Sequence, residues 1–354
     1  MRTAQIIKGR GAQINPENQY TNIKHVKLHP EGIDLEDAED IPTSYFIEQS
    51  KNIISKNKSP DLKFMHSINP YQGCAHGCIY CYARNTHEYW GFGPGLDFER
   101  KILLKLNAPL RLEHSFNMPT YKPEPLFISG NTDCYQPIER KLKLTRALLA
   151  LCLKYRHPVS IITKNKLILR DLDILEPLAR LQLIHVAISL NSLQEDLRRK
   201  LEPRTATSRE RLNVIQQLSA KGIPVLLMCA PIIPGLNSSE VPEVIREAAL
   251  HGAQSASYTI VRLNGAVSPI FEDWINKAYP NRAQKVLNAI KSCHGGNLSD
   301  MQWGRRIKGD GAIAESIQQL FKISKSKFMG DTQMPDLRTD LFCPRQGTQL
   351  SLFN

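Results

Sequence analysis

Short apolar runs recur through the middle of the chain, separated by longer stretches of mixed polarity. The runs have the length and composition typical of buried strands, and they lie at residues 62–68, 125–129, 159–163, 185–190, 225–230 and 258–262. The stretches between them carry apolar residues at helical spacing, most clearly at residues 141–154, 209–221, 241–250 and 282–293. Thr207 and Glu210 have the spacing of a capping box, and Gly222 follows the end of that predicted helix.

This alternation predicts an α/β protein with a parallel sheet. Because crossovers between parallel strands are right-handed, we expect the sheet to curl into a partial (β/α)6-type TIM barrel. A flat, doubly wound sheet is the main alternative. We predict an N-terminal extension over residues 1–60, the barrel over residues 61–296, and a C-terminal helix with a loosely ordered polar tail over residues 297–354.

The composition is that of a globular protein with a sizeable core: of 354 residues, 42% are hydrophobic and 23% are charged. The longest apolar stretch, residues 223–233, is too short to span a membrane and contains Pro224 and Pro231. The first residues lack the apolar core of a signal peptide. We therefore expect a cytoplasmic protein with no membrane partner.

The net charge of +12 makes an anionic partner plausible, and nucleic acid is the obvious one. Residues 140–170 contain nine Lys or Arg and no Asp or Glu. A solvated basic face is an equally good interpretation of this stretch, since charge alone specifies no partner.

Three of the eight cysteines, Cys74, Cys78 and Cys81, lie within eight residues. Three thiolates on one loop can bind three corners of a cubane iron–sulfur cluster and leave the fourth iron open to a small molecule. The alternative is a structural zinc site with His76 or His87 as the fourth ligand. The spacing favours the cluster, because it is not that of paired CxxC knuckles.

The motif Cys-x3-Cys-x-Tyr-Cys over residues 74–81 resembles the signature of the radical S-adenosylmethionine (SAM) superfamily. Together with the CYAR that ends it, the motif resembles the branch that contains spore photoproduct lyase, over residues 62–295. The segments RGA-x2-NP (residues 10–16) and RN-x-HEYWGF (residues 84–92), followed by PGLDFERK, are similar to an uncharacterised subfamily of that branch. The resemblance implies a [4Fe-4S] cluster on the three cysteines that cleaves SAM reductively to a 5′-deoxyadenosyl radical, which abstracts hydrogen from a substrate.

The resemblance also implies SAM contacts near the ends of the strands. It assigns the adenine to Tyr80, the ammonium group to Thr132 and Asp133, the carboxylate to Lys164 and Arg204, and the ribose and carboxylate to Ser189 and Asn191. Structural alternatives exist for most of these residues: packing for Tyr80, a turn or helix cap for Thr132 and Asp133, a surface position for Lys164, and an ion pair with Glu202 for Arg204.

Two further residues are candidates for hydrogen transfer. Tyr82 matches a tyrosine proposed to relay a hydrogen atom in the lyase, although it could instead be a packing aromatic. The lyase carries a hydrogen-donating cysteine at the position that corresponds to Gly130, so reversal of a thymine dimer should not be assumed for this chain. Cys134 is a hypothetical substitute for that hydrogen donor. It directly follows Asp133, so its side chain is expected to point away from the position of the lyase cysteine.

The last residues contain QLSLF, which resembles the pentapeptide by which bacterial replication and repair proteins dock on the DNA sliding clamp. The contacts would come from Gln349, Leu350, Leu352 and Phe353, much as other short peptides bind through a few buried side chains. Alternatively, the apolar side chains fold back on the domain.

We therefore expect a radical SAM enzyme that acts on DNA or another nucleic acid, in repair or modification, with an electron donor such as flavodoxin or ferredoxin. One alternative is a radical SAM enzyme with a small-molecule or peptide substrate. The other is a noncatalytic, metal-stabilised module that binds DNA or the clamp.

Overall fold

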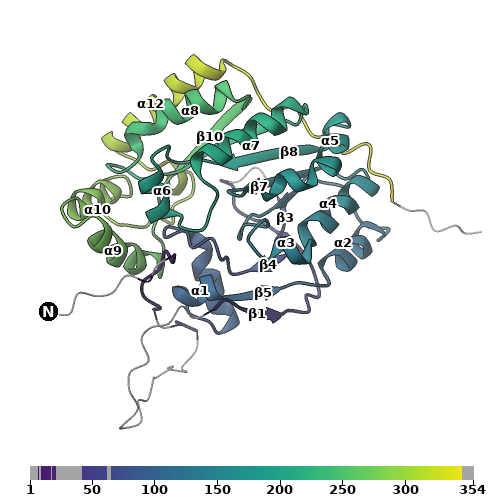
Figure 1. The fold of residues 1–354 in the computed structure, drawn as a ribbon, viewed down its shortest axis with the longest axis horizontal. Coiled ribbons are helices and arrows are strands. Elements are labelled where there is room, and N and C mark those ends of the chain that lie inside the picture. The colour runs from purple at the N-terminus through teal and green to yellow at the C-terminus, as the bar shows by residue number, and fades with distance from the viewer. Residues whose placement is uncertain (1–6, 8, 17, 21–41, 62–64, 345–354) are drawn as a thin grey trace, which may run out of the picture.

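The computed structural model describes residues 7, 9–16, 18–20, 42–61 and 65–344, and Figure 1 shows their arrangement. A sheet of seven strands forms the centre of the molecule, and a second sheet of three strands lies beside it. The tail motif over residues 349–353 lies outside the described residues. In the described part of the chain, no helix is long and apolar enough to cross a membrane.

The large sheet is an open parallel barrel. Its strands, in spatial order, are β10 (Ser255–Ile260), β9 (Val225–Ile232), β8 (Ile184–Ser189), β7 (Val159–Thr163), β6 (Leu126–Ile128), β3 (His66–Ile68) and β2 (Ile54–Lys56). The six strands from β3 to β10 run parallel, and β2 is antiparallel to β3. Along these six strands the spatial order never reverses, whereas a doubly wound sheet requires a reversal. The partial (β/α)6-type barrel is therefore confirmed.

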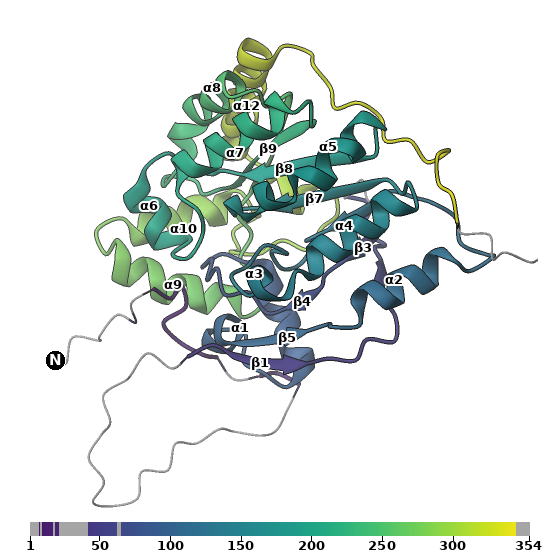
Figure 2. The same cartoon turned by 45° about the vertical axis from the view of Figure 1, so that its right-hand side comes forward.

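Right-handed crossovers place the connecting helices on one face of this sheet. The outer layer consists of α2 (Ala108–Phe116), α4 (Leu144–Lys154), α5 (Leu172–Arg180), α7 (Ser208–Ala220), α8 (Val241–Leu250) and α12 (Ala312–Met329). Figures 1 and 2 show these helices side by side along the sheet, and α12 packs on α8.

The other helices lie toward the ends of the strands. They are η1 (Tyr82–Trp90), α1 (Leu96–Arg100), α3 (Glu139–Leu142), η2 (Lys166–Asp171), α6 (Glu195–Leu201), η3 (Ser238–Glu240), α9 (Val267–Ala278), α10 (Ala283–Ser292) and α11 (Arg305–Lys308). Of these, η1, η2 and η3 are 3₁₀ helices.

The core lies between the sheet and the outer helices. In β7, Val159, Ile161 and Thr163 are buried, whereas Ser160 and Ile162 on the opposite face are half-buried. The same alternation recurs in β9. One face of the sheet is therefore packed against helices, and the concave face is left more open to accept other groups.

The predicted elements agree with the structure where the pattern is local. The strand over residues 159–163 and the helix over residues 241–250 have the predicted bounds, and the capping box between Thr207 and Glu210 is present on both sides. The predicted helix over residues 141–154 is instead broken at Lys143, whose φ is 54°. The Glu139 carboxylate accepts the amide of Thr145 at 3.1 Å and so caps a new helix start.

The predicted division at residue 60 does not separate two parts of the fold. Strand β2 belongs to the barrel sheet, and β1 (Ser44–Ile47) pairs in parallel with β5 (Lys101–Leu104), which pairs in turn with β4 (Tyr71–Gln72). The N-terminal residues therefore complete sheets whose other strands come from the predicted barrel domain.

The C-terminal segment, residues 331–344, is held more firmly than predicted. The amide of Arg338 donates to the carbonyl of Gln182, and that of Cys343 to the carbonyl of Tyr155, both at 3.0 Å. His185 Nε2 lies 2.6 Å from the carbonyl oxygen of Pro335. The segment therefore crosses the amino ends of β7 and β8, and Figure 1 shows it in yellow passing α5.

Candidate active site

The three clustered cysteines lie on one loop at the carboxyl edge of the barrel. The loop follows β3 and the two-residue strand β4, and it leads into η1. Cys74 and Cys78 are buried, Cys81 is half-buried, and none of the three forms a disulfide. Two glycines shape the loop: Gly73 and Gly77 have φ values of 79° and 71°, and a Cβ on Gly77 would lie 2.9 Å from Glu99 Oε2.

Hydrogen bonds from distant parts of the chain hold the loop backbone. The amide of Cys74 donates to the Phe98 carbonyl at 2.9 Å, and the amide of Ile79 to the Leu201 carbonyl at 3.0 Å. The Gln136 side chain bridges the loop, accepting from the amide of Ala75 and donating to the carbonyl of Gly73, both at 3.1 Å. The path of the loop is therefore fixed by tertiary contacts.

A buried ion pair supports the middle cysteine. Arg84 donates two hydrogen bonds to the Cys78 carbonyl, from Nε at 3.1 Å and from a terminal nitrogen at 2.9 Å. The same terminal nitrogen lies 2.6 Å from Glu99 Oε1, and both side chains are completely buried. Neither residue was a predicted site residue. The signal was present in the segments RN-x-HEYWGF and PGLDFERK, which contain them.

Asp133 and Thr132 connect the end of β6 to the cysteine loop and to β7. The Asp133 carboxylate accepts from Thr163 Oγ1 and the Lys164 amide, both at 2.8 Å, and it lies 3.3 Å from His76 Nδ1. Burial opposes charge on Asp133, but His76 and these hydrogen bonds lower its pKa to about 2. Thr132 donates its hydroxyl to the Tyr71 carbonyl at 2.6 Å. Asp133 also accepts from the amide of Tyr135 at 2.9 Å, which is a turn contact, whereas the Thr132 hydroxyl makes a tertiary one. The contact of both residues with SAM stays a prediction.

Lys164 is half-buried beside Cys78. Burial alone would lower its pKa, but the neighbouring Cys78 and Glu202 favour the charged form and raise it. Glu202 accepts a hydrogen bond from the Tyr80 hydroxyl and forms an ion pair with Arg211. Tyr80 is therefore held by a buried polar chain. The ion pair of Glu202 is with Arg211 and not, as the sequence suggested, with Arg204.

The remaining predicted SAM contacts lie at the end of β8 and after α6. Ser189 and Asn191 are buried, and both polar atoms of the Asn191 side chain lack a hydrogen-bond partner among the described residues. A buried amide without partners is costly unless a further group satisfies it. Arg204 reaches the loop by donating its amide to the His76 carbonyl at 3.2 Å, and its Nε donates to the Gly9 carbonyl at 2.9 Å.

The two candidates for hydrogen transfer have different surroundings. Tyr82 is 52% exposed, and its hydroxyl donates to the carbonyl of Gly130, the position that corresponds to the lyase cysteine. Cys134 is completely buried in the hydrophobic core, and burial holds the pKa of its thiol well above the usual range. The structure gives Cys134 the surroundings of a core residue, so its role as a donor gains no support.

The donor set fits a cubane cluster better than a closed zinc site. Of the two histidines offered as a fourth zinc ligand, His76 lies beside Cys74 but is also engaged by Asp133 and Asn165. His87 packs between Phe92 and Phe98. Three thiols without a fourth protein ligand are what a cluster with one open iron requires. In the part of the chain that the structure describes, no group of three or more His, Cys, Asp or Glu side chains is already gathered to hold a metal ion.

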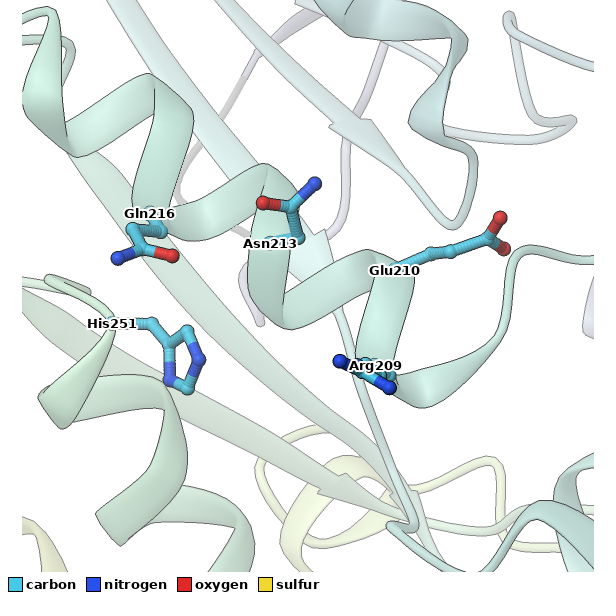
Figure 3. A pocket seen from close by; sticks show the side chains of 5 residues that line it. All are labelled: Arg209, Glu210, Asn213, Gln216 and His251. Carbon is cyan, nitrogen blue, oxygen red and sulfur yellow. The ribbon is translucent and has the colours of Figure 1, made fainter.

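A surface hollow lies away from these residues. It has a volume of about 450 Å³ and is lined by residues of α7 together with His251, as Figure 3 shows. The lining residues are Arg209, Glu210, Asn213, Gln216 and His251. None of the predicted site residues contributes to it.

An open parallel barrel with three free thiols on the loop after its first parallel strand is the arrangement of the radical SAM class. The family model of the radical SAM superfamily matches residues 68–248. The chain belongs to this superfamily and is an enzyme of that class, which sets aside the noncatalytic alternative.

The relatives agree with this assignment. An uncharacterised protein of Mycobacterium tuberculosis is 33% identical over 229 residues, which cover 63% of this chain and 67% of the relative. An uncharacterised protein of Methanocaldococcus jannaschii is 28% identical over 240 residues, 68% of this chain and 85% of the relative. Among solved structures, spore photoproduct lyase complexed with dinucleoside spore photoproduct has a similar fold, with a TM-score of 0.58 over 81% of this chain and 80% of the lyase at 16% identity.

Proposed function

We propose that Cys74, Cys78 and Cys81 hold a [4Fe-4S] cluster and that the chain uses it with SAM to modify or repair nucleic acid. The observation that carries the reaction class is the set of three free thiols on one loop at the carboxyl edge of a radical SAM barrel. When bound, such a cluster supplies the electron that cleaves SAM to a 5′-deoxyadenosyl radical.

The residues around the loop support SAM binding by their chemistry. Lys164 is a cation beside Cys78 and suits a carboxylate. Asn191 has donors and an acceptor to offer, since its buried amide is unsatisfied by the described residues. These two residues would orient SAM, and Tyr82 would face the substrate because it is exposed immediately after Cys81.

An arginine near Tyr82 and an exposed tryptophan in the segment after α10 favour an anionic substrate with aromatic rings. Arg262 follows β10 at the carboxyl edge and is half-buried, and it donates to the Asp300 carbonyl at 3.5 Å. Its segment is tied to η1, because Asn85 donates to the Asn264 carbonyl at 2.9 Å. Trp303 is 53% exposed, and the Arg306 guanidinium lies 3.8 Å from its ring centroid. Phosphates bind arginine, and bases stack on exposed aromatic rings.

The spore photoproduct lyase structure was solved with a dinucleoside photoproduct. Together with the net charge of +12, this likeness favours nucleic acid over a small molecule or peptide. The role of Gly130 argues against the lyase's own reaction, since glycine has no side chain with which to donate hydrogen. We further propose an electron donor such as flavodoxin or ferredoxin, and sliding-clamp docking through Gln349, Leu350, Leu352 and Phe353.

The reaction class is tested by anaerobic reconstitution with iron and sulfide, followed by reduction in the presence of SAM. We expect a brown protein that releases 5′-deoxyadenosine and a Cys78→Ala variant that does neither. A colourless wild-type protein that binds zinc instead would contradict the proposal.

The substrate is tested by single-stranded DNA binding over a series of salt concentrations. We expect Trp303→Ala to weaken binding by roughly 10-fold, and Arg262→Gln to reduce the slope against log salt by about 1. Arg246→Gln on the outer helix α8 is the matched control and should change neither value. Equal binding by all three variants would contradict the proposal of a nucleic-acid substrate.

The tail is tested separately. Deletion of residues 349–353 should abolish binding to the sliding clamp.

A further inference from the structure

The N-terminal arm, residues 9–16 and 18–20, lies directly against the cysteine loop. An added Cβ on Gly11 would lie 1.7 Å from the carbonyl oxygen of Gly77, so the two backbones are in contact. Gly11 does not have a positive φ. It is therefore required by the closeness of the loop and not by the conformation of its own backbone.

One buried carboxylate joins the arm to the central cysteine. Glu99 accepts from the amide of Ala12 at 2.8 Å and from that of Gly11 at 3.2 Å, and its Oε1 also accepts from Arg84 at 2.6 Å. Arg84 in turn donates twice to the Cys78 carbonyl. A completely buried charge needs all of these partners. Removing the arm would leave Glu99 short of two hydrogen bonds and would loosen the arginine that fixes Cys78.

Two more anchors fix the direction of the arm. Asn15 Oδ1 accepts from the amide of Gly95 at 3.2 Å. Asn18 donates to the carbonyls of Glu88 and Phe92, and the Glu88 carboxylate accepts from the amide of Gln19 at 3.0 Å. The segment RGA-x2-NP therefore contacts Glu99, and Asn18 and Gln19, which follow it in the arm, contact Glu88.

We propose that the N-terminal arm is a wall of the metal site, in which Gly11 and Glu99 are positioning residues that hold Cys78 in place and keep solvent and oxygen from it. The part of this inference that concerns a metal cluster rests on the proposed function. The part that concerns access to Cys78 does not.

The test compares two measurements on the full chain. In the cluster-free protein, alkylation of each cysteine by iodoacetamide is followed by mass spectrometry, with exposed Cys343 as the reactive reference and core Cys152 and Cys229 as reporters of general unfolding. In the reconstituted protein, iron per chain and the rate of bleaching in air are measured. The variants are Gly11→Ala, Glu99→Gln and the control Gly222→Ala, a position with φ of 70° and no atom within 4 Å of the added Cβ.

We expect Gly11→Ala and Glu99→Gln to raise alkylation of Cys78 by about 10-fold while Cys152 and Cys229 stay protected, because the opening is local. Both variants should also hold less iron and bleach faster, and Gly222→Ala should do neither. Unchanged alkylation of Cys78 in Gly11→Ala would overturn the inference, as would an equal rise at all buried cysteines. Wild type could take up no cluster while Gly11→Ala still exposes Cys78 selectively. That result would support the role of the arm and contradict the proposed cluster.

Discussion

The two ends of the described chain cross opposite edges of the same sheet, and they are anchored by different kinds of side chain. The N-terminal arm lies at the carboxyl edge and is held by buried carboxylates and backbone amides around Glu99 and Glu88. The C-terminal segment lies at the amino edge. Backbone hydrogen bonds hold it there as well, but its side-chain anchor is the Phe342 ring, which packs among the rings of Phe116, Tyr121, Tyr155 and His157.

This difference follows from what each edge has to do. Hydrogen bonds and ion pairs are directional, so they can specify where the Cys78 backbone lies. Apolar packing is non-directional and tolerates small shifts, which is sufficient where no chemistry takes place. The comparison predicts that substitutions at the N-terminal arm change metal binding at the proposed site. Substitutions at the C-terminal segment should change only the free energy of unfolding.

The largest effect is expected from Glu99→Ala, which tests the polar edge. The change leaves Arg84 buried without its carboxylate and leaves the amides of Gly11 and Ala12 unpaired. We expect the free energy of unfolding of the cluster-free protein to fall by about 3–5 kcal/mol, measured by urea denaturation. Asp173→Ala removes an ion pair in which Asp173 is 60% exposed and should cost less than about 1 kcal/mol. A similarly small fall in the free energy of unfolding for Glu99→Ala would show that the buried ion pair contributes no more than the exposed one.

The next effect is a pH dependence that belongs to the apolar edge. His157 is buried, with Nε2 at 2.8 Å from the Tyr121 hydroxyl and Nδ1 at 2.9 Å from the Pro158 carbonyl oxygen. Burial lowers its pKa to about 4, below the ordinary 6.5. The unfolded chain takes up a proton at this histidine below pH 6.5, whereas the folded chain does so only near pH 4. The free energy of unfolding therefore has its full value above pH 6.5 and falls by on the order of 3 kcal/mol as pH falls from 6.5 to 4.

This dependence is measured by urea denaturation of the cluster-free protein across that pH range, with His157→Phe as the comparison. The variant should lose this part of the pH dependence, since phenylalanine cannot take up a proton. An identical pH profile in the two proteins would show that other groups control acid sensitivity.

The smallest effect is expected from Phe342→Ala at the same edge. The ring is half-buried, so its loss should cost about 1–2 kcal/mol, roughly half the cost at a fully buried position. Iron content and SAM cleavage of the reconstituted variant should remain those of wild type. A variant that loses iron would show that the two edges are coupled, and the comparison would then fail.

Much of the barrel was predictable because its signals are local. Strand β7 and helix α8 have the predicted bounds, and the capping box between Thr207 and Glu210 involves neighbours in one turn. Strands β1, β2, β4 and β5 were missed. They are two to four residues long, which is too short for a periodic pattern, and they exist because other strands pair with them.

The site was predictable in part for the same reason. Cys74, Cys78 and Cys81 stand close together in sequence, so their spacing indicated a metal site before any fold was known. The hydrogen bonds of Thr132 and Asp133 could not be foreseen, since a strand-end hydroxyl or carboxylate can serve a ligand or a turn equally well. Only the positions of His76 and Thr163 decided that Asp133 is engaged by the protein.

The sequence by itself indicated the class of chemistry and the alternation of strands and helices in the barrel, because both depend on spacing between nearby residues. Only the tertiary structure decided that the N-terminal arm lies against the cysteine loop and that the C-terminal segment lies at the opposite edge. The reason is that Glu99 reaches Gly11 and Arg84, and Phe342 reaches Phe116, only after the chain has folded. What each contact contributes then depends on burial, which no local pattern of the sequence contains.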